Sequence, residues 1–168
     1  MGGYDKSKSP WKAWVQLEFH NEQAVGAWPD KDGFDAQCAG MVAQLANNPC
    51  ETLEAEQPLR IEEYGFQLDS EGAGKFRGGL GMVREYRCLI DDTVLQMRSE
   101  RMKHQPYGLH GGQHSKPTRI TLSQAGEERQ MPSKFLVNLS KGDSVRIEWP
   151  GAGGSGPPVE RDPEKVLG

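Results

Sequence analysis

Apolar and polar residues alternate over most of the chain, in short runs separated by glycine, proline and aspartate. Alternation with a period of two places successive side chains on opposite faces of a sheet, so these runs predict strands. They cover residues 14–19, 59–68, 81–90, 93–101, 119–123, 134–139 and 144–149. Because only Asp91-Asp92 separates the runs at 81–90 and 93–101, the sequence predicts that these two pair as a hairpin.

One segment has a different period. Cys38, Met41, Val42 and Leu45 lie at helical spacing, which predicts a short amphipathic helix over residues 34–46 that ends at Asn47-Asn48-Pro49. The chain has 168 residues, and its 21 glycines and 11 prolines favour short strands and turns over long helices. We therefore expect a mainly β (α+β) fold with one or two short helices. A single β-sandwich-like domain would span residues 1–149, and an extended Gly/Pro-rich tail at 150–168 would pack on a partner.

Charge and cysteine content exclude several classes of protein. The net charge is −4, so there is no basic field to hold nucleic acid. No apolar run approaches the ~20 residues of a membrane span, and the opening MGGYDKSKSP lacks the apolar core of a secretory signal. The three cysteines are scattered and form no CxxC pair, which fits a reducing, cytoplasmic setting and argues against a zinc ribbon.

The stretch SEGAGKFRGGLG, residues 70–81, combines glycines with basic residues as a phosphate cradle does. A P-loop needs a glycine where Asp69 stands and a hydroxyl residue where Phe76 stands. The dinucleotide fingerprint fails at Arg77, and a strand pattern follows instead of a helix. The stretch therefore predicts a tight connection between strands and no nucleotide site.

The histidines and acidic residues give no clear catalytic group. His104, His110 and His114 flank Gly111-Gly112 in a loop, which favours exposed or hydrogen-bonded side chains over a metal site. An acidic segment favours a solvated face, or a match for arginines on a partner, over an acid–base pair. It contains Glu51, Glu54, Glu56, Glu62 and Glu63.

Cysteine and arginine placement points the same way. No nucleophile motif surrounds Cys38 or Cys50, and we expect Cys38 to be a small buried residue. Arg84 should share the face of Tyr86, two positions on, while Arg87 points away. Polar residues on both faces of this run suggest contact with another protein or domain.

Several blocks occur in the order typical of the late part of the hydantoinase B / 5-oxoprolinase B family, which this chain resembles. They are PCETLEAEQPLRIEEYGFQLDSEGAGKFRGGLGMVREYR, ERMKHQPYGLHGG and KFLVNLSKGDSVRIEWPGAGGSGPPVERDPEKV, and the opening GGYD also fits. Glu71, His20-Asn21-Glu22 and GSGPP depart from the family pattern. The family's B-type protein is several times longer, and the resemblance covers its C-terminal third. The resemblance places the family's metal-binding residues and most of its substrate cavity in the N-terminal part.

The resemblance implies a role in an ATP-dependent complex. Family members hydrolyse cyclic amides or carboxylate ketones such as acetone and acetophenone; ATP binds to an A-type subunit that phosphorylates the substrate, and the B-type subunit completes the reaction. We expect a small subunit of a ketone-carboxylase-like complex resembling acetophenone carboxylase. The alternatives are a split subunit of a cyclic-amide hydrolase and a purely structural subunit. The expected partners are A-type (hydantoinase A-like) ATP-binding subunits and a larger B-type subunit, with no nucleic acid and no membrane.

The resemblance also selects residues. Its motif or interface positions in this chain are Gly74, Lys75, Arg77, Gly78, Gly79, Gly81, Arg84 and His110. The four glycines should sit where a Cβ would be obstructed, and Arg77, for which we expect no local acidic partner, should point toward a partner subunit. We expect no cofactor or metal on this chain, ATP and a divalent metal on partner subunits, and no activity from the isolated chain; no catalytic residue is identified.

Overall fold

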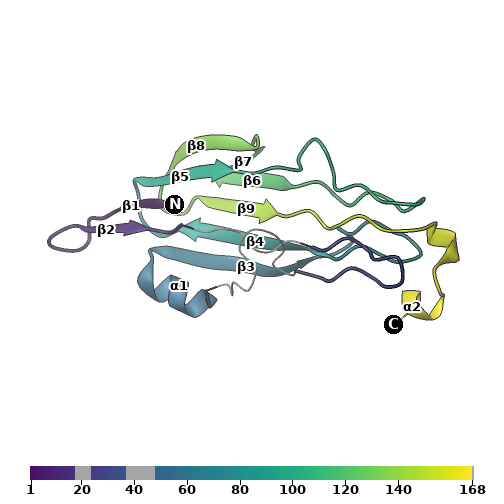
Figure 1. Ribbon diagram of the computed structural model, residues 1–168. Coiled ribbons are helices and arrows are strands. Elements are labelled where there is room, and N and C mark those ends of the chain that lie inside the picture. The colour runs from purple at the N-terminus through teal and green to yellow at the C-terminus, as the bar shows by residue number, and fades with distance from the viewer. Residues whose placement is uncertain (18–23, 37–47, 168) are drawn as a thin grey trace.

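Two antiparallel sheets stack to form most of the molecule in the computed structural model, which describes residues 1–17, 24–36 and 48–167 (Figure 1). The four-stranded sheet has the order β2-β1-β5-β8, with β1 Gly2–Asp5, β2 Lys12–Val15, β5 Thr93–Arg98 and β8 Lys134–Leu139. The five-stranded sheet has the order β3-β4-β9-β6-β7, with β3 Leu59–Gln67, β4 Gly81–Cys88, β6 Arg119–Gln124, β7 Glu127–Gln130 and β9 Ser144–Glu148. The described helices are α1 Cys50–Glu56, a 3-10 turn Pro158–Glu160, and α2 Glu164–Leu167.

The core lies between the two sheets. Trp14, Leu95 and Leu139 project inward from the four-stranded sheet, and Tyr86 and Ile147 meet them from the other. Along β5 every second residue is buried and the residues between are exposed, as a strand with one wet face requires. The expected mainly β, α+β sandwich is confirmed.

The predicted hairpin between residues 81–90 and 93–101 is wrong. β4 belongs to the five-stranded sheet, whereas β5 pairs with β1 and β8 in the other. Alternation shows that each strand buries one face, but two such strands can pair edge to edge or pack face to face with the same pattern. Here the short connection crosses from one layer to the other.

The other strand predictions are confirmed with small changes at their ends, except that the run at 14–19 is represented by β2, which ends at Val15. β1 and β7 were not predicted, since GGYD and EERQ carry no apolar alternation. Most of the predicted helix 34–46, with Cys38, lies outside the described residues. α1 begins at Cys50, directly after the expected helix end, and buries Leu53 against the sheet. Among the described helices, none has the length and apolar character needed to cross a membrane.

Candidate functional site

Four extended segments meet beyond the sheets, at the end of the molecule that carries the C-terminus (Figure 1). They are residues 24–36, 70–81, 106–116 and 150–156, and we call them the glycine bundle. Backbone hydrogen bonds join them laterally: Phe76 and Ser155 exchange two, Leu109 N–H donates to Gly154, and Gly33 N–H donates to Arg77. Each segment is thus held by backbone groups of another.

The bundle requires glycine because backbone packs directly on backbone. A Cβ on Gly78 would lie 1.9 Å from the carbonyl oxygen of Ala152, and one on Gly79 would lie 1.9 Å from that of Phe34. At Gly74 and Gly81 the nearest backbone atoms would be 2.6 and 2.2 Å away. The expectation that a Cβ would be obstructed at these four positions is confirmed, and close approach is the reason.

The C-terminal tail enters the same bundle. A Cβ added to Gly151, Gly153 or Gly154 would have a backbone atom of another segment within 2.4 Å. Residues 150–156 therefore pack inside this chain, and the expectation that the tail packs on a partner needs correction for that part. For residues 157–168 contact with a partner stays a prediction.

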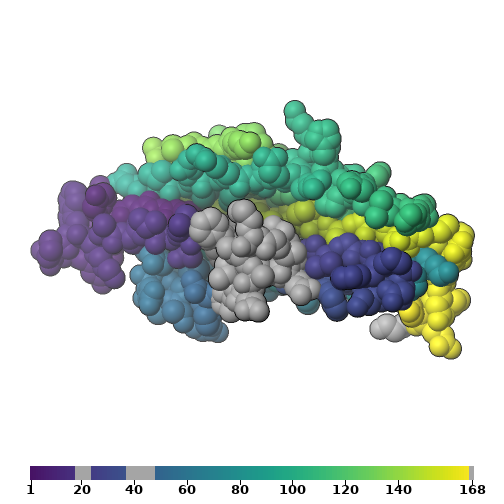
Figure 2. All heavy atoms as spheres, in the orientation of Figure 1, coloured from purple at the N-terminus to yellow at the C-terminus, as the bar shows by residue number. Residues whose placement is uncertain are grey.

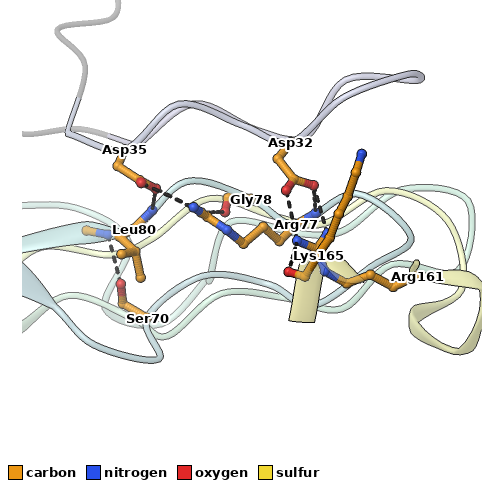
Figure 3. Close-up of polar contacts among 9 residues, drawn as sticks. Asp32, Asp35, Ser70, Arg77, Gly78, Leu80, Arg161 and Lys165 are labelled. Carbon is orange, nitrogen blue, oxygen red and sulfur yellow. Dashed lines mark hydrogen bonds and ion pairs between the residues drawn. The ribbon is translucent and has the colours of Figure 1, made fainter. Parts of the chain in front are cut away.

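Arg77 pairs with an aspartate of its own chain. Its Nη1 and Nη2 donate to Oδ1 and Oδ2 of Asp35 at 2.8 and 3.2 Å, and Nη1 also donates to the Gly78 carbonyl at 2.9 Å (Figure 3). The Leu80 N–H donates to the same carboxylate at 2.7 Å. Arg77 therefore has an acidic partner within its own chain, which corrects the expectation of none, because Asp35 lies 42 residues away in sequence and beside it in space. Contact of Arg77 with a partner subunit stays a prediction.

A second ion pair joins the C-terminal tail to the 24–36 segment of the bundle. Arg161 Nη1 and Nη2 donate to Oδ1 and Oδ2 of Asp32 at 2.8 and 2.9 Å, and Nη2 also reaches the Lys165 carbonyl at 3.2 Å (Figure 3). The backbone N–H of Arg77 donates to Asp32 Oδ1 at 2.8 Å. In the space-filling view the blue segment 24–36 lies against the yellow tail (Figure 2).

These pairs shift the protonation of both aspartates. The hydrogen bonds from Arg161 lower the pKa of Asp32 below the ordinary value of 3.8, and those from Arg77 lower the pKa of Asp35 in the same way. The pKa values of Arg77 and Arg161 are raised by the same hydrogen bonds. All four groups are therefore charged at neutral pH.

The remaining cations of the bundle lie at its surface. Lys75 Nζ is 3.5 Å from Glu160 Oε2, and both side chains are about half exposed. Lys165 Nζ lies 5.5 Å from the centre of the Phe76 ring. These contacts add weak attachments between the 70–81 segment and the tail.

Arg84 faces the core and is only 1% exposed. As predicted it shares a face with Tyr86, to whose hydroxyl its Nη1 donates at 2.9 Å, and its guanidinium lies 4.0 Å from the centre of the Tyr64 ring. A side chain enclosed by its own domain does not meet a partner surface, so the interpretation of Arg84 as an interface residue needs correction.

The three loop histidines, His104, His110 and His114, are exposed, and His110 has φ +52°. In the described ranges no three His, Cys, Asp or Glu side chains are grouped as a metal site. Cys88 is buried, which raises the pKa of its thiol to about 11 and leaves it protonated.

The acidic segment meets arginines of its own chain. Arg87 Nε donates to Glu62 Oε1 at 2.6 Å, and Arg146 pairs with Glu63. Both acids are on β3, while the arginines are on β4 and β9. The segment is thus in part a set of cross-strand ion pairs.

Sequence reasoning missed Asp32, Asp35 and Arg161. No local signal marks the two aspartates, because their partners lie 42 and 129 residues away. Arg161 stands in the ERDP block that the family resemblance includes. Since Asp32, Asp35 and the two arginines pair with one another, the arrangement fixes the relative positions of these segments and presents no acid–base pair among the four.

Comparison with known proteins gives the family context. A profile of the hydantoinase B/oxoprolinase family matches residues 1–158. The chain is 34% identical to a putative B-type subunit of a D-/L-hydantoinase from Pseudomonas sp. (strain NS671), over 92% of its own length and 26% of that protein. An acetone carboxylase structure superposes with a TM-score of 0.76 at 18% identity, over 87% of this chain and 24% of that one.

An ATP-dependent caprolactamase from Pseudomonas jessenii superposes with a TM-score of 0.69 at 24% identity, over 86% of this chain and 26% of that one. These two likenesses concern the fold. The chain spans about a quarter or less of the length of the curated relatives it matches.

Proposed function

This chain belongs to the hydantoinase B/oxoprolinase family, and we propose that it is a small subunit on the B-type side of an ATP-dependent ketone carboxylase. The proposal rests on a comparison between the length of this chain and the length of its relatives. The family match spans 1–158, almost the whole chain, yet the chain spans about a quarter or less of the length of its relatives. A module of this size acts together with the rest of a B-type protein.

The carboxylase assignment is supported by the acetone carboxylase likeness, which has the higher TM-score of the two superpositions described above. In such a complex ATP binds to an A-type subunit, which transfers phosphate to an oxygen of the substrate. ATP and a divalent metal therefore belong to partner subunits in this proposal. The present chain contributes a rigid sandwich whose glycine bundle fixes the positions of four segments.

A cyclic-amide hydrolase is the second candidate. It is favoured by the identity with the putative hydantoinase protein and by the fold shared with a caprolactamase. In both candidates ATP activates a carbonyl or amide oxygen of the substrate. The two differ in their reactants: the carboxylase uses a ketone and an inorganic carbon source, and the hydrolase uses a cyclic amide and water.

The test is reconstitution. The chain is co-expressed with an A-type subunit and a larger B-type subunit, and ADP release is measured with a ketone plus bicarbonate and, separately, with hydantoin, oxoproline or caprolactam. Ketone- and bicarbonate-dependent turnover that requires this chain supports the carboxylase. Turnover with a cyclic amide selects the second candidate. If the chain joins the complex but turnover is the same without it, its role is structural.

The chain alone should not turn over ATP, because the 70–81 stretch fails the P-loop pattern and is hydrogen-bonded to the other segments of the bundle through its backbone. ADP release by the purified chain, free of larger subunits, contradicts this expectation.

A further inference from the structure

The two outer faces of the sandwich differ in chemistry. On the five-stranded sheet the outward side chains of neighbouring strands form a polar lattice: Arg146 pairs with Glu63 and Glu148, and Ser144 donates to Glu85 at 2.7 Å. Thr121 and Gln130 are hydrogen-bonded beside them. A lattice of this kind is stable in water.

The outer face of the four-stranded sheet carries a large exposed apolar side chain on each strand, with the polar Gln96 and Asn138 beside them on β5 and β8. Val15 of β2 and Val94 of β5 pair with Gly2 of β1 from its two sides. Leu136 of β8 pairs with Gln96, which lies two positions after Val94 on β5 and points to the same face. Val15 is 72% exposed, Leu136 66%, Tyr4 58% and Val94 39%. Each of the four strands therefore contributes one large exposed apolar side chain to the same face. We call these four residues the apolar face.

Two basic residues lie at one end of the apolar face. Arg98 and Lys134 lie opposite each other at one end of it, and Lys134 Nζ is 3.1 Å from Glu100. Within the ranges that the structure describes, no carboxylate pairs with Arg98. A complementary surface would be apolar at its centre and carry a carboxylate where it meets Arg98.

We propose that the apolar face is the surface on which this chain docks to the larger B-type subunit, a proposal that rests on the function proposed above. Its relatives carry several times as much chain, so in them a domain of this kind has covalent neighbours to cover an exposed sheet. Large exposed apolar residues gathered on one face mark such an interface. The polar lattice on the opposite face stays in water.

The test uses Leu136→Lys, which places a charge on the part of the apolar face that lies on the edge strand β8, without touching the core. Gln130→Lys is the matched control, since it adds the same charge at an exposed position of the polar lattice. Binding of the tagged chain to the larger B-type subunit is measured by calorimetry, with melting curves and light scattering of each variant alone. We expect Leu136→Lys to weaken binding at least about tenfold, Gln130→Lys to bind as the wild type does, and both to melt as the wild type does. Arg98→Gln should weaken binding by a smaller factor.

The outcomes separate the two proposals. Wild-type affinity in Leu136→Lys overturns the docking face while leaving the subunit assignment intact. A wild-type chain that binds no B-type subunit overturns both. A wild-type chain that is a dimer on its own, and that Leu136→Lys converts to a monomer, assigns the apolar face to a second copy and also overturns the proposal.

Discussion

Arg161 binds Asp32 across 129 residues of sequence: its Nη1 donates to Oδ1 at 2.8 Å and its Nη2 donates to Oδ2 at 2.9 Å. Only 13% of the Arg161 side chain is exposed. The pair fastens the end of the C-terminal tail to the segment that also carries Asp35. It therefore holds the outside of a bundle whose inside is almost entirely backbone.

Replacing Arg161 with Ala should release the end of the tail. We expect faster proteolytic cleavage after residue 156 and a loss of about 1 kcal/mol in the free energy of unfolding, in the range of hydrogen bonds to charged groups that are partly solvated. Lys75→Ala is the control, since its pair with Glu160 is half exposed, and it should leave both readouts near the wild type. Equal cleavage of wild type and Arg161→Ala would contradict the fastening role.

Arg77→Ala should destabilise the domain. The change removes two hydrogen bonds to Asp35 and one to the Gly78 carbonyl, and it leaves a half-buried carboxylate with only the Leu80 N–H. We expect a loss of about 1–3 kcal/mol in the free energy of unfolding, measured by urea denaturation. Arg77→Lys keeps the charge but not the planar fork and should recover only part of it. A variant that melts as the wild type does but fails to join larger subunits would contradict this expectation and support the interface interpretation.

Gly78→Ala tests the glycine bundle. The added Cβ would lie 1.9 Å from the Ala152 carbonyl oxygen, so two backbone segments must separate, and we expect a loss of at least about 3 kcal/mol, at the upper end for point substitutions. Gly65→Ala on β3 is the matched control, because nothing lies within 4 Å of its Cβ position. It should be neutral or slightly stabilising. Similar melting temperatures for the two variants would show that the bundle is not tightly packed.

Acid should weaken the bundle through Asp32 and Asp35. Both carboxyl groups have folded-state pKa values below 3.8, so the unfolded chain binds protons more readily. Their contribution is complete above pH 3.8 and is lost as the pH falls through the lowered folded pKa. In the double variant Asp32→Asn, Asp35→Asn the free energy of unfolding should therefore fall less steeply with acid than in the wild type, measured by denaturation at successive pH values. Asp30→Asn serves as a control for loss of charge in the same segment.

The sequence by itself determined the strands whose apolar residues alternate. In β4 the spacing of Arg84 and Tyr86 was enough to place both on one face, since a strand fixes the direction of every second side chain. The glycine positions were equally readable: a dense run of glycine between strand patterns predicts close backbone approach, and Gly78 and Gly79 show it. The family blocks were also readable from the sequence, because each block is a continuous run of residues.

Only the tertiary structure decided which strands pair and which charges meet. β4 and β5 follow each other in sequence but lie in different layers, and local periodicity has the same form for both arrangements. β7 forms without apolar residues because β6 offers it an edge to bond. The partner of Arg77 came from a segment 42 residues away. An ion pair depends on distance in space, and the distance in space between two loops is set by the packing of the sheets that carry them.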